Sequence, residues 1–199
     1  METGESGMVL VAFSVCKKGV EPMNRNIVLY IATSLDGYIA RENGGIDWLI
    51  GESNDLDVEN GYNDFYRQID TVVMGRTTYE QIIHELSPES WVYEGKACYV
   101  ATTRRSEPDH RVEFIKEDIT GFVKNLKQEQ GKDIWLVGGG KLIDQFMKQD
   151  LIDKYIITII PSILGNGIPL FLGKNPEIKL KLNETKTFDG MVELTYVRR

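Results

Sequence analysis

The stretch DIWLVGGGKLIDQFMKQD, residues 133–150, decides the fold of this chain because it joins a strand to a helix through three adjacent glycines. Residues 133–140 are apolar before they run into the glycines, which predicts a buried strand. Beyond them, Leu142, Phe146 and Met147 share one face at helical spacing, which predicts a helix. Glycine backbone lets a phosphate approach the helix N-terminus, where free N–H groups and the helix dipole favour anions. We therefore expect an α/β unit that binds phosphate.

A second junction of the same kind lies at VVMGRTTYE, residues 72–80. A short strand ends at Gly75, and a helix over residues 76–86 follows, with its apolar residues at helical spacing. Arg76 stands where it can reach a phosphate, and Thr77 or its neighbour can cap the helix. Two such junctions in one small sheet indicate a long ligand with several phosphates.

Hydroxyl and guanidinium groups follow the next expected strand, at ATTRR, residues 101–105. Thr103 and Arg104 offer donors that suit a phosphate monoester, such as the 2′-phosphate of NADP. Taken alone, this segment fits a solvated loop equally well. Together with the two glycine junctions, it favours a dinucleotide phosphate site.

A glycine-containing loop, SLDGYIARENGGIDW, follows the first expected strand. Gly44 and Gly45 permit this loop to move, and Trp48 can cover a flat ring. Asp36 and Asp47 are the carboxylates nearest to it. Each can supply a proton to a substrate, but Asp36 also fits a turn and Asp47 a helix cap.

Strands and helices alternate along the chain, and two strands close it. This order predicts βαβ units and a mostly parallel sheet covered by helices. Residues 178–199 alternate like a β-hairpin that turns at Asp189 and Gly190, which predicts an antiparallel edge. The other expected strands are residues 26–33, 70–75, 96–103, 112–116, 133–140 and 153–161, and the expected helices are residues 76–86, 118–131 and 141–150.

Composition excludes several functional classes. The chain has 199 residues, 42% of them hydrophobic and 27% charged, as in an ordinary globular domain. A net charge of −7 argues against nucleic-acid binding, which needs a cationic surface. Two cysteines without a CxxC motif fit a reducing cytoplasm. With only two histidines, His84 and His110, both expected on the surface, we predict no metal site and no histidine-based triad.

The first 23 residues do not resemble the rest of the chain. Their apolar run, residues 8–16, is much shorter than the ~20 residues that span a membrane. A secretory signal begins with positive charge, whereas Lys17 and Lys18 follow the run here. We expect residues 1–23 to be a poorly ordered, non-family extension, with Met23 as an alternative start, and residues 24–199 to form one domain without membrane contact.

Taken in order, these pieces resemble the dihydrofolate-reductase-like superfamily. They are most similar to its branch related to the RibD C-terminal (bifunctional deaminase-reductase C-terminal) domain of riboflavin biosynthesis. No single motif is specific, but the ordered set is. The resemblance implies an α/β three-layer fold, with a central, mostly parallel sheet of about eight strands, helices on both faces and a C-terminal antiparallel hairpin. The segments that carry it, between residues 26 and 199, are SLDGYIA, GGIDW, MGRTTYE, TTR, WLVGGG-KL and DKYIITIIPSILGNGIPLF.

The resemblance also implies an activity, a cofactor and a site. The expected protein is an NADPH-dependent oxidoreductase that transfers hydride to a small heterocyclic or imine-type substrate, such as 5-amino-6-(5-phosphoribosylamino)uracil. Asp36 and Asp47 are the candidate proton donors, and a homodimer is compatible with the family. The residues expected to contact the cofactor are Ala32, Ile46, Trp48, Gly75, Arg76, Thr77, Thr103, Arg104, Gly138, Gly139, Gly140, Lys141 and Leu142.

Two departures from the resemblance leave alternatives open. A folate reductase carries an acidic residue on the helix before MGR, and neither Glu59 nor Asp64 aligns with it. The zinc deaminase that is often fused to the riboflavin enzyme would need an HxE…PCxxC pattern, which is absent here. The alternatives to a riboflavin-type reductase are a folate-type reductase with an altered anchor and a nucleotide-binding module without turnover.

Overall fold

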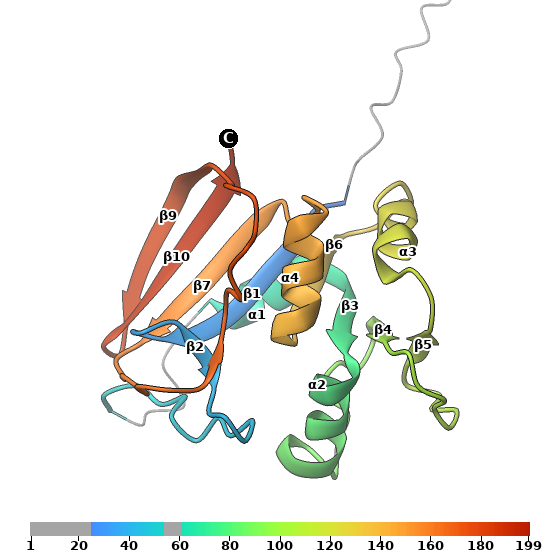
Figure 1. Cartoon of the computed structure of the whole chain (residues 1–199), viewed down its shortest axis with the longest axis horizontal. Helices are drawn as coiled ribbons and strands as arrows, with labels where there is room; N and C mark the ends of the chain where they lie inside the picture. The colour runs from blue at the N-terminus through green and yellow to red at the C-terminus, as the bar shows by residue number, and fades with distance from the viewer. Residues whose placement is uncertain (1–24, 54–60) are drawn as a thin grey trace, which may run out of the picture.

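The computed structural model describes residues 25–53 and 61–199, and a twisted eight-stranded sheet runs through them (Figure 1). The strand order is β5-β4-β3-β6-β1-β7-β10-β9. The first six strands of this order are parallel, and the β10–β9 hairpin adds an antiparallel edge. The strands are β1 (Ile27–Ser34), β3 (Ile69–Gly75), β4 (Ala97–Ala101), β5 (Glu113–Ile115), β6 (Asp133–Gly138), β7 (Lys154–Ile160), β9 (Leu180–Phe188) and β10 (Met191–Arg198).

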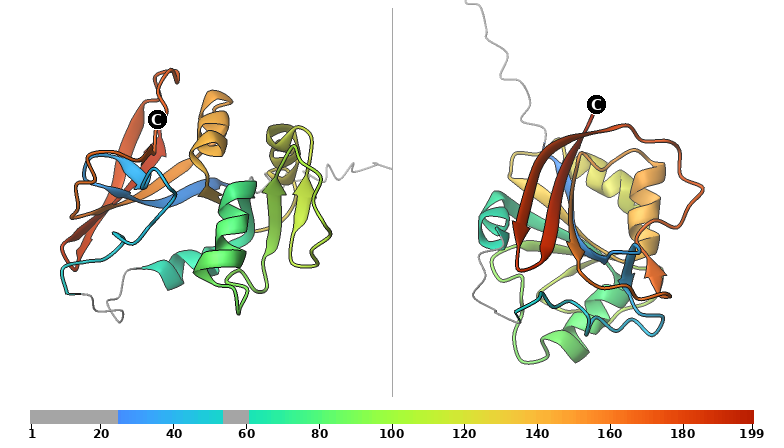
Figure 2. Two further views of the ribbon diagram at one scale, coloured as in Figure 1. Left: turned by 60° about the horizontal axis from the view of Figure 1, so that its bottom comes forward. Right: turned by 90° about the vertical axis from the view of Figure 1, so that its left-hand side faces the viewer.

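Helices cover both faces of the sheet because the central strands are apolar on both sides. In β1, Ile27 and Leu29 face a core that contains α3 (Ile119–Leu126) and α4 (Gly140–Lys148). Val28 points the other way, into a core with Phe65 of α1 (Tyr62–Gln68) and Tyr79 of α2 (Arg76–Gln81). The predicted three-layer α/β fold is therefore confirmed, and Figure 2 shows the hairpin and β5 at opposite edges of the sheet.

Two helices differ from the expected bounds. The helix expected over residues 76–86 ends as an α-helix at Gln81, and a π-helix, η1 (Ile82–Leu86), continues it with the Ser87 N–H bonded to the Ile82 carbonyl. The helix expected over residues 118–131 ends at Leu126. The next residues, KQEQG, are polar and offer no apolar side chain to bury, so packing does not stabilise further turns.

A small second sheet was not expected from the sequence. β2 (Tyr38–Ala40) pairs with β8 (Ile168–Pro169) and ties the loop after β1 to the segment after β7. Gly167 lies so close to this pairing that a β-carbon on it would stand 2.3 Å from the Ala40 carbonyl oxygen. The turn-rich stretch after Pro161 is thus held by backbone contacts.

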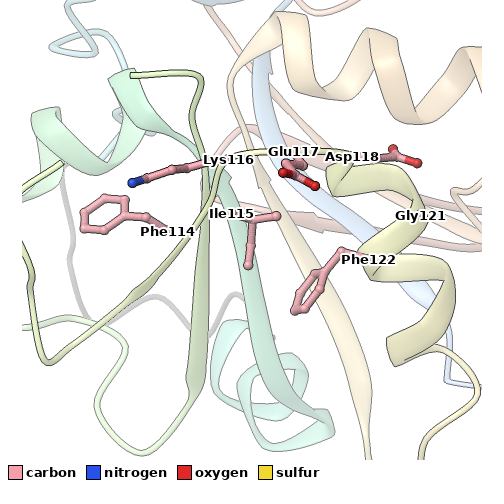
Figure 3. Close-up of a pocket in the computed structure, with 7 residues that line it drawn as sticks. All are labelled: Phe114, Ile115, Lys116, Glu117, Asp118, Gly121 and Phe122. Carbon is pink, nitrogen blue, oxygen red and sulfur yellow. The ribbon is translucent and has the colours of Figure 1, made fainter. Parts of the chain in front are cut away.

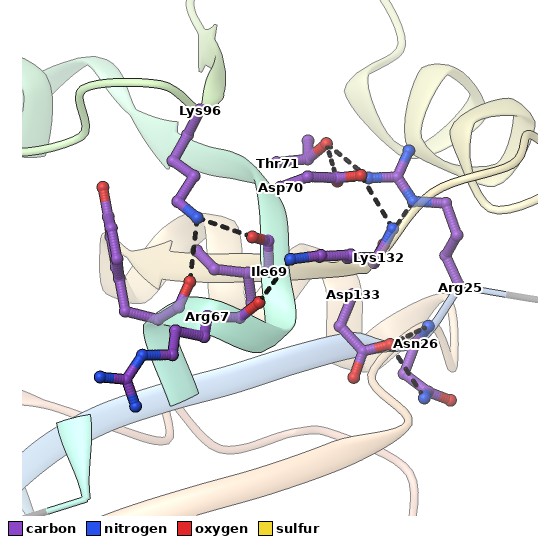
Figure 4. A network of polar contacts seen from close by, with 10 residues as sticks. Arg25, Asn26, Arg67, Ile69, Asp70, Thr71, Lys96, Lys132 and Asp133 are labelled. Carbon is purple, nitrogen blue, oxygen red and sulfur yellow. Dashed lines mark hydrogen bonds and ion pairs between the residues drawn. The ribbon is translucent and has the colours of Figure 1, made fainter. Parts of the chain in front are cut away.

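A polar network ties together the amino ends of β1, β3 and β6, at the sheet edge opposite the carboxyl ends (Figure 4). Arg25 is 5% exposed, and its guanidinium bonds to Asp70, Thr71 and the Lys132 carbonyl. Asp133 accepts bonds from the backbone and side chain of Asn26. Side-chain hydrogen bonds thus fix the amino ends of these strands, whereas the carboxyl ends remain open to form a binding site.

No described helix is long and apolar enough to cross a membrane. In the described ranges, no three of His, Cys, Asp and Glu gather as metal ligands would. His84 and His110 are exposed, as expected. Cys98 is buried, whereas Cys16, like the whole expected extension, lies outside the described residues.

Candidate active site

A cleft of about 1150 Å³ follows the carboxyl ends of β1, β3, β4, β6 and β7. Open α/β sheets bind ligands at this edge, where loops and helix starts converge beyond the strands. Most of the predicted cofactor residues line the cleft. They are Ala32, Ile46, Gly75, Arg76, Thr77, Thr103, Arg104, Gly138, Gly139, Gly140, Lys141 and Leu142.

The two glycine junctions meet in this cleft. A β-carbon on Gly139 would stand 3.5 Å from the Thr78 hydroxyl oxygen and 4.0 Å from the Gly75 α-carbon. Gly138 and Gly139 have φ values of 144° and 84°, which residues with a side chain rarely adopt. Gly139 is the N-cap of α4, so the N–H groups of the residues that follow it lie at the start of that helix. The sequence thus builds a bare backbone cradle that fits a pyrophosphate.

A basic group lies at the β3–β4 side of the cleft. The Arg76 guanidinium contacts the Glu80 carboxylate and the Ser106 hydroxyl, each at 2.7 Å, and the Arg105 carbonyl oxygen at 3.2 Å. Thr103 and Arg104 are exposed beside it and line the same cleft. The structure thus brings the predicted phosphate-binding side chains together.

A shallow pocket of about 650 Å³ adjoins this basic group (Figure 3). It lies between β5 and the start of α3, with Phe114 and Phe122 among its walls. Ile115 and Glu117 line both this pocket and the main cleft, so the two are adjacent.

The loop over residues 41–50 covers the cleft from the β1 side. The Gln81 side chain donates to the Gly44 carbonyl at 2.8 Å and fastens the loop to α2. Ile46 and Leu49 line the cleft, whereas Trp48 is 4% exposed and is not part of the lining. The Trp48 indole N–H is buried without a hydrogen-bond partner, which is unusual for a buried donor.

The two predicted proton donors lie outside the cleft lining. The Asp36 carboxylate accepts bonds from the Ser34 hydroxyl and from two backbone N–H groups, those of Leu164 and Gly165. These bonds, that from Ser34 first, lower the pKa of Asp36. The Arg41 guanidinium donates two hydrogen bonds of 2.7 Å to the Asp47 carboxylate and likewise lowers the pKa of Asp47. Both groups are carboxylates held in loops, and their role in proton transfer stays a prediction.

Aromatic rings form one wall of the cleft: Tyr30, Tyr62, Tyr93 and Trp135, called here the aromatic wall. Tyr30 lies 6.2 Å from Tyr62 and 6.1 Å from Trp135 between ring centroids, and Trp135 lies 5.4 Å from Tyr93. Burial raises the pKa values of all three tyrosines, so they remain protonated. No motif in the sequence points to this wall.

Glu193 is a buried carboxyl group behind the wall, and the sequence analysis missed it too. Across the sheet it pairs with Thr158 of β7, which pairs with Ala32 of β1, so the three share one face. The Glu193 side chain is 4% exposed, and the Thr158 hydroxyl donates to it at 3.4 Å. Tyr30 also hydrogen-bonds to it. Burial raises the pKa of Glu193, which its neighbours only partly counter.

Comparisons with known proteins agree with this architecture. The model of the RibD C-terminal domain family matches residues 25–194. In Bacillus subtilis, the uncharacterized proteins YwjB and YyaP are 50% and 37% identical to the chain, over 88% and 86% of its length and 99% and 94% of theirs.

Solved structures give the same result. A putative riboflavin biosynthesis protein from Shewanella is 30% identical, with a TM-score of 0.77 over 87% of this chain and 99% of that one. A Thermotoga maritima diaminohydroxyphosphoribosylaminopyrimidine deaminase/5-amino-6-(5-phosphoribosylamino)uracil reductase shares the fold, with a TM-score of 0.66 and 17% identity. The match covers 88% of this chain and 57% of that one.

Proposed function

This chain belongs to the RibD C-terminal domain family, and we propose that it is an NADPH-dependent reductase of a small heterocyclic or imine-type substrate. One observation carries the proposal: the glycine cradle at Gly75 and Gly139 opens into the same cleft as Arg76 and Arg104. A bare backbone beside guanidinium groups suits a ligand with a pyrophosphate and a further phosphate.

The residues present fit this cofactor. The N–H groups at the start of α4 and the exposed Lys141 border the cleft, where they would bind the negatively charged phosphates. Ser106 and Glu80 hold the Arg76 guanidinium beside the cleft, where a phosphate monoester would share it with the Glu80 carboxylate. Ala32, at the end of β1, leaves room for a flat ring because its side chain is small.

When bound, NADPH supplies the hydride, and the chain's own residues supply placement and exclusion of water. The aromatic wall packs against the face of a substrate ring. Ile46 and Leu49 cover the cleft and lower its water content. The hydroxyls of Tyr30 and Thr158 are the polar groups that line the cleft next to Ala32 on this face, and they can orient the atom that accepts the proton.

Titration with NADPH and NADH tests the cofactor assignment. Energy transfer from the three tryptophans to the nicotinamide reports binding. We expect tight NADPH binding and weaker NADH binding. If neither nucleotide binds, the assignment of all three phosphate-binding segments is wrong.

Two alternatives remain as proposals with their own readouts. A folate-type reductase would consume NADPH with dihydrofolate and be inhibited by antifolates. Against it, Asp64 is exposed on α1 and paired with Arg67, while Glu59 lies outside the described residues. A nucleotide-binding module would bind NADPH but would not oxidise it with any candidate substrate. The expected homodimer can be checked by sizing chromatography.

A further inference from the structure

Positive charge is unevenly distributed along the cleft. Among the described residues, the cations that line it are Arg76, Arg104 and Lys141. All three lie at or beyond the carboxyl ends of β3, β4 and β6, where the cofactor phosphates are proposed to bind. In the aromatic wall, Tyr30 lies on β1, Trp135 on β6 and Tyr62 on α1, and Tyr93 lies in the turn before β4. Apart from the three cations at the carboxyl ends, no described residue that lines the cleft is a lysine or an arginine.

The cation nearest to the buried carboxyl group is already engaged. Lys186 of β9 contacts Glu184 at 3.6 Å and Glu193 at 3.9 Å, and its side chain is 44% exposed. The Lys186 ammonium group therefore already pairs with the carboxyl groups of Glu184 and Glu193. A substrate phosphate against the aromatic wall would have to compete with Glu184 and Glu193 for this ammonium group.

Packing against neighbouring rings holds the residues of the wall in fixed orientations. Tyr30 stacks on Phe65 with centroids 4.3 Å apart and planes 10° apart, which fixes the orientation of its ring. Tyr62 and Trp135 meet edge to face at 6.0 Å. Aromatic faces are electron-rich, so they attract other rings and, more strongly, cations.

Glu193 places a titratable carboxyl group behind this wall. The charged or polar groups that face it are Tyr30 from β1, Thr158 from β7, and Lys186 and Glu184 from β9. Burial favours its neutral form, whereas a positive ring in the cleft would favour ionisation because the intervening medium is poorly polarisable. Glu193 does not line the cleft, so it acts through Tyr30 and Thr158, which do.

We propose that the aromatic wall takes a flat, phosphate-free ring that is neutral or positively charged, and that Glu193, acting through Tyr30 and Thr158, is the positioning residue that selects this charge. The inference deepens the proposed function, since it names the substrate class for the same cleft. It sets this chain apart from a reductase of phosphoribosylated pyrimidines.

Three bicyclic probes of one size test the charge preference directly. They are 1-methylquinolinium, quinoline and quinoline-2-carboxylate, which are positive, neutral and negative at neutral pH. Ligand-observed NMR measures their affinities in the presence of saturating NADP⁺, and again without it. We expect the cation to bind at least as tightly as quinoline, and the anion about ten-fold more weakly, given the effective dielectric of protein sites. Equal affinities, or preference for the anion, would overturn the proposal.

A pair of matched variants tests the part played by Glu193. Glu193→Gln should weaken binding of the cation relative to quinoline, while the affinity for quinoline itself stays. In the wild type the affinity for the cation should rise with pH as Glu193 ionises, and the variant should show no such rise. Glu184→Gln is the control, because Glu184 also contacts Lys186 but its side chain is 52% exposed. Should Glu193→Gln fail to fold, the wild-type pH dependence and probe order still decide.

Turnover separates this inference from the proposed function. NADPH oxidation is compared with 5-amino-6-(5-phosphoribosylamino)uracil and with its dephosphorylated nucleoside. Faster turnover of the nucleoside supports both. Faster turnover of the phosphorylated compound supports the reductase but overturns the inference. If NADPH does not bind, the proposed function fails, and the quinoline series still decides the charge preference of the wall.

Discussion

Gly139 lies beside Gly75, and a β-carbon on Gly139 would stand in van der Waals contact with the Gly75 α-carbon, at 4.0 Å. Gly139→Ala should therefore weaken NADPH binding in two ways. The residue has φ of 84°, which costs an alanine about 1 kcal/mol or more, and the new methyl group narrows the cradle. We expect the NADPH dissociation constant to rise at least ten-fold in a tryptophan energy-transfer titration.

Gly95→Ala is the matched control for that variant. Gly95 has φ of 75°, and nothing lies within 4 Å of its β-carbon position. Gly95→Ala should lower the melting temperature by a similar amount and leave the NADPH affinity unchanged. If both variants bind NADPH as the wild type does, the cradle does not hold the cofactor.

Arg76 offers a test of the choice between NADPH and NADH. Arg76→Ala removes a guanidinium held by Ser106 at 2.7 Å, and charged hydrogen bonds to a phosphate contribute about 1.5–3 kcal/mol. NADPH should bind more weakly by that amount, and NADH should bind almost unchanged. Arg105→Ala is the control, since only the Arg105 carbonyl, and not its side chain, contacts Arg76. An equal loss for both nucleotides would mean that Arg76 does not read the 2′-phosphate.

The fold was predictable because each junction repeats the same local pattern. An apolar strand, a glycine and a helix with one apolar face occur at Gly75 and again at Gly138, and parallel strands place such junctions at one edge. The Asp189-Gly190 turn was equally readable, because both residues adopt positive φ in it. Local sequence therefore indicated where the carboxyl ends of the strands would converge.

The burial of Glu193 could not be predicted, because it depends on distant parts of the chain and not on a local pattern. In MVELTYV it alternates with apolar residues, and such a position normally faces solvent. The face is instead covered by Tyr30 and α1, which come from the other end of the chain. The surroundings of Asp36 were not predictable for a similar reason, because its partners Leu164 and Gly165 are distant in sequence. Long-range partners decide what a carboxyl group does, and one sequence does not reveal them.

The proton-donor prediction for Asp36 and Asp47 can be tested separately from folding. Both are candidate proton donors, so we expect Asp36→Asn and Asp47→Asn to slow turnover while NADPH affinity stays nearly unchanged. Asp36→Asn should also lower the melting temperature by loosening the loop at Leu164 and Gly165. Single-turnover NADPH oxidation and thermal unfolding measure the two effects. Unchanged turnover in both variants would remove the two residues from the mechanism.

The Arg25 network predicts a loss of stability that spares the site. Arg25→Ala removes a buried guanidinium and leaves Asp70 and Thr71 without their shared donor, which should cost about 2–4 kcal/mol of unfolding free energy. The network lies at the amino ends of the strands, so NADPH affinity should not change. Urea unfolding measures the free energy of unfolding, and the energy-transfer titration measures the NADPH affinity. Weaker NADPH binding in the folded variant would show that the amino ends of the strands influence the binding site at their carboxyl ends.

Asp109 predicts how stability depends on pH. Its carboxylate bonds to the Arg111 side chain and accepts a 2.5 Å bond from the Tyr79 hydroxyl, and these bonds, with Arg111 first, lower the pKa of Asp109. A carboxyl group whose pKa is lower in the folded state stabilises the fold above its unfolded pKa of about 3.9, and this stability is lost as the pH falls toward the folded value. Asp109→Asn should lower the unfolding free energy by about 1–3 kcal/mol at neutral pH, and by progressively less below pH of about 4. Asp64→Asn removes an exposed carboxylate that pairs with Arg67, so it should change little at any pH. A deficit for Asp109→Asn that persists undiminished in acid would mean that packing, and not the charge, is what Asp109 contributes.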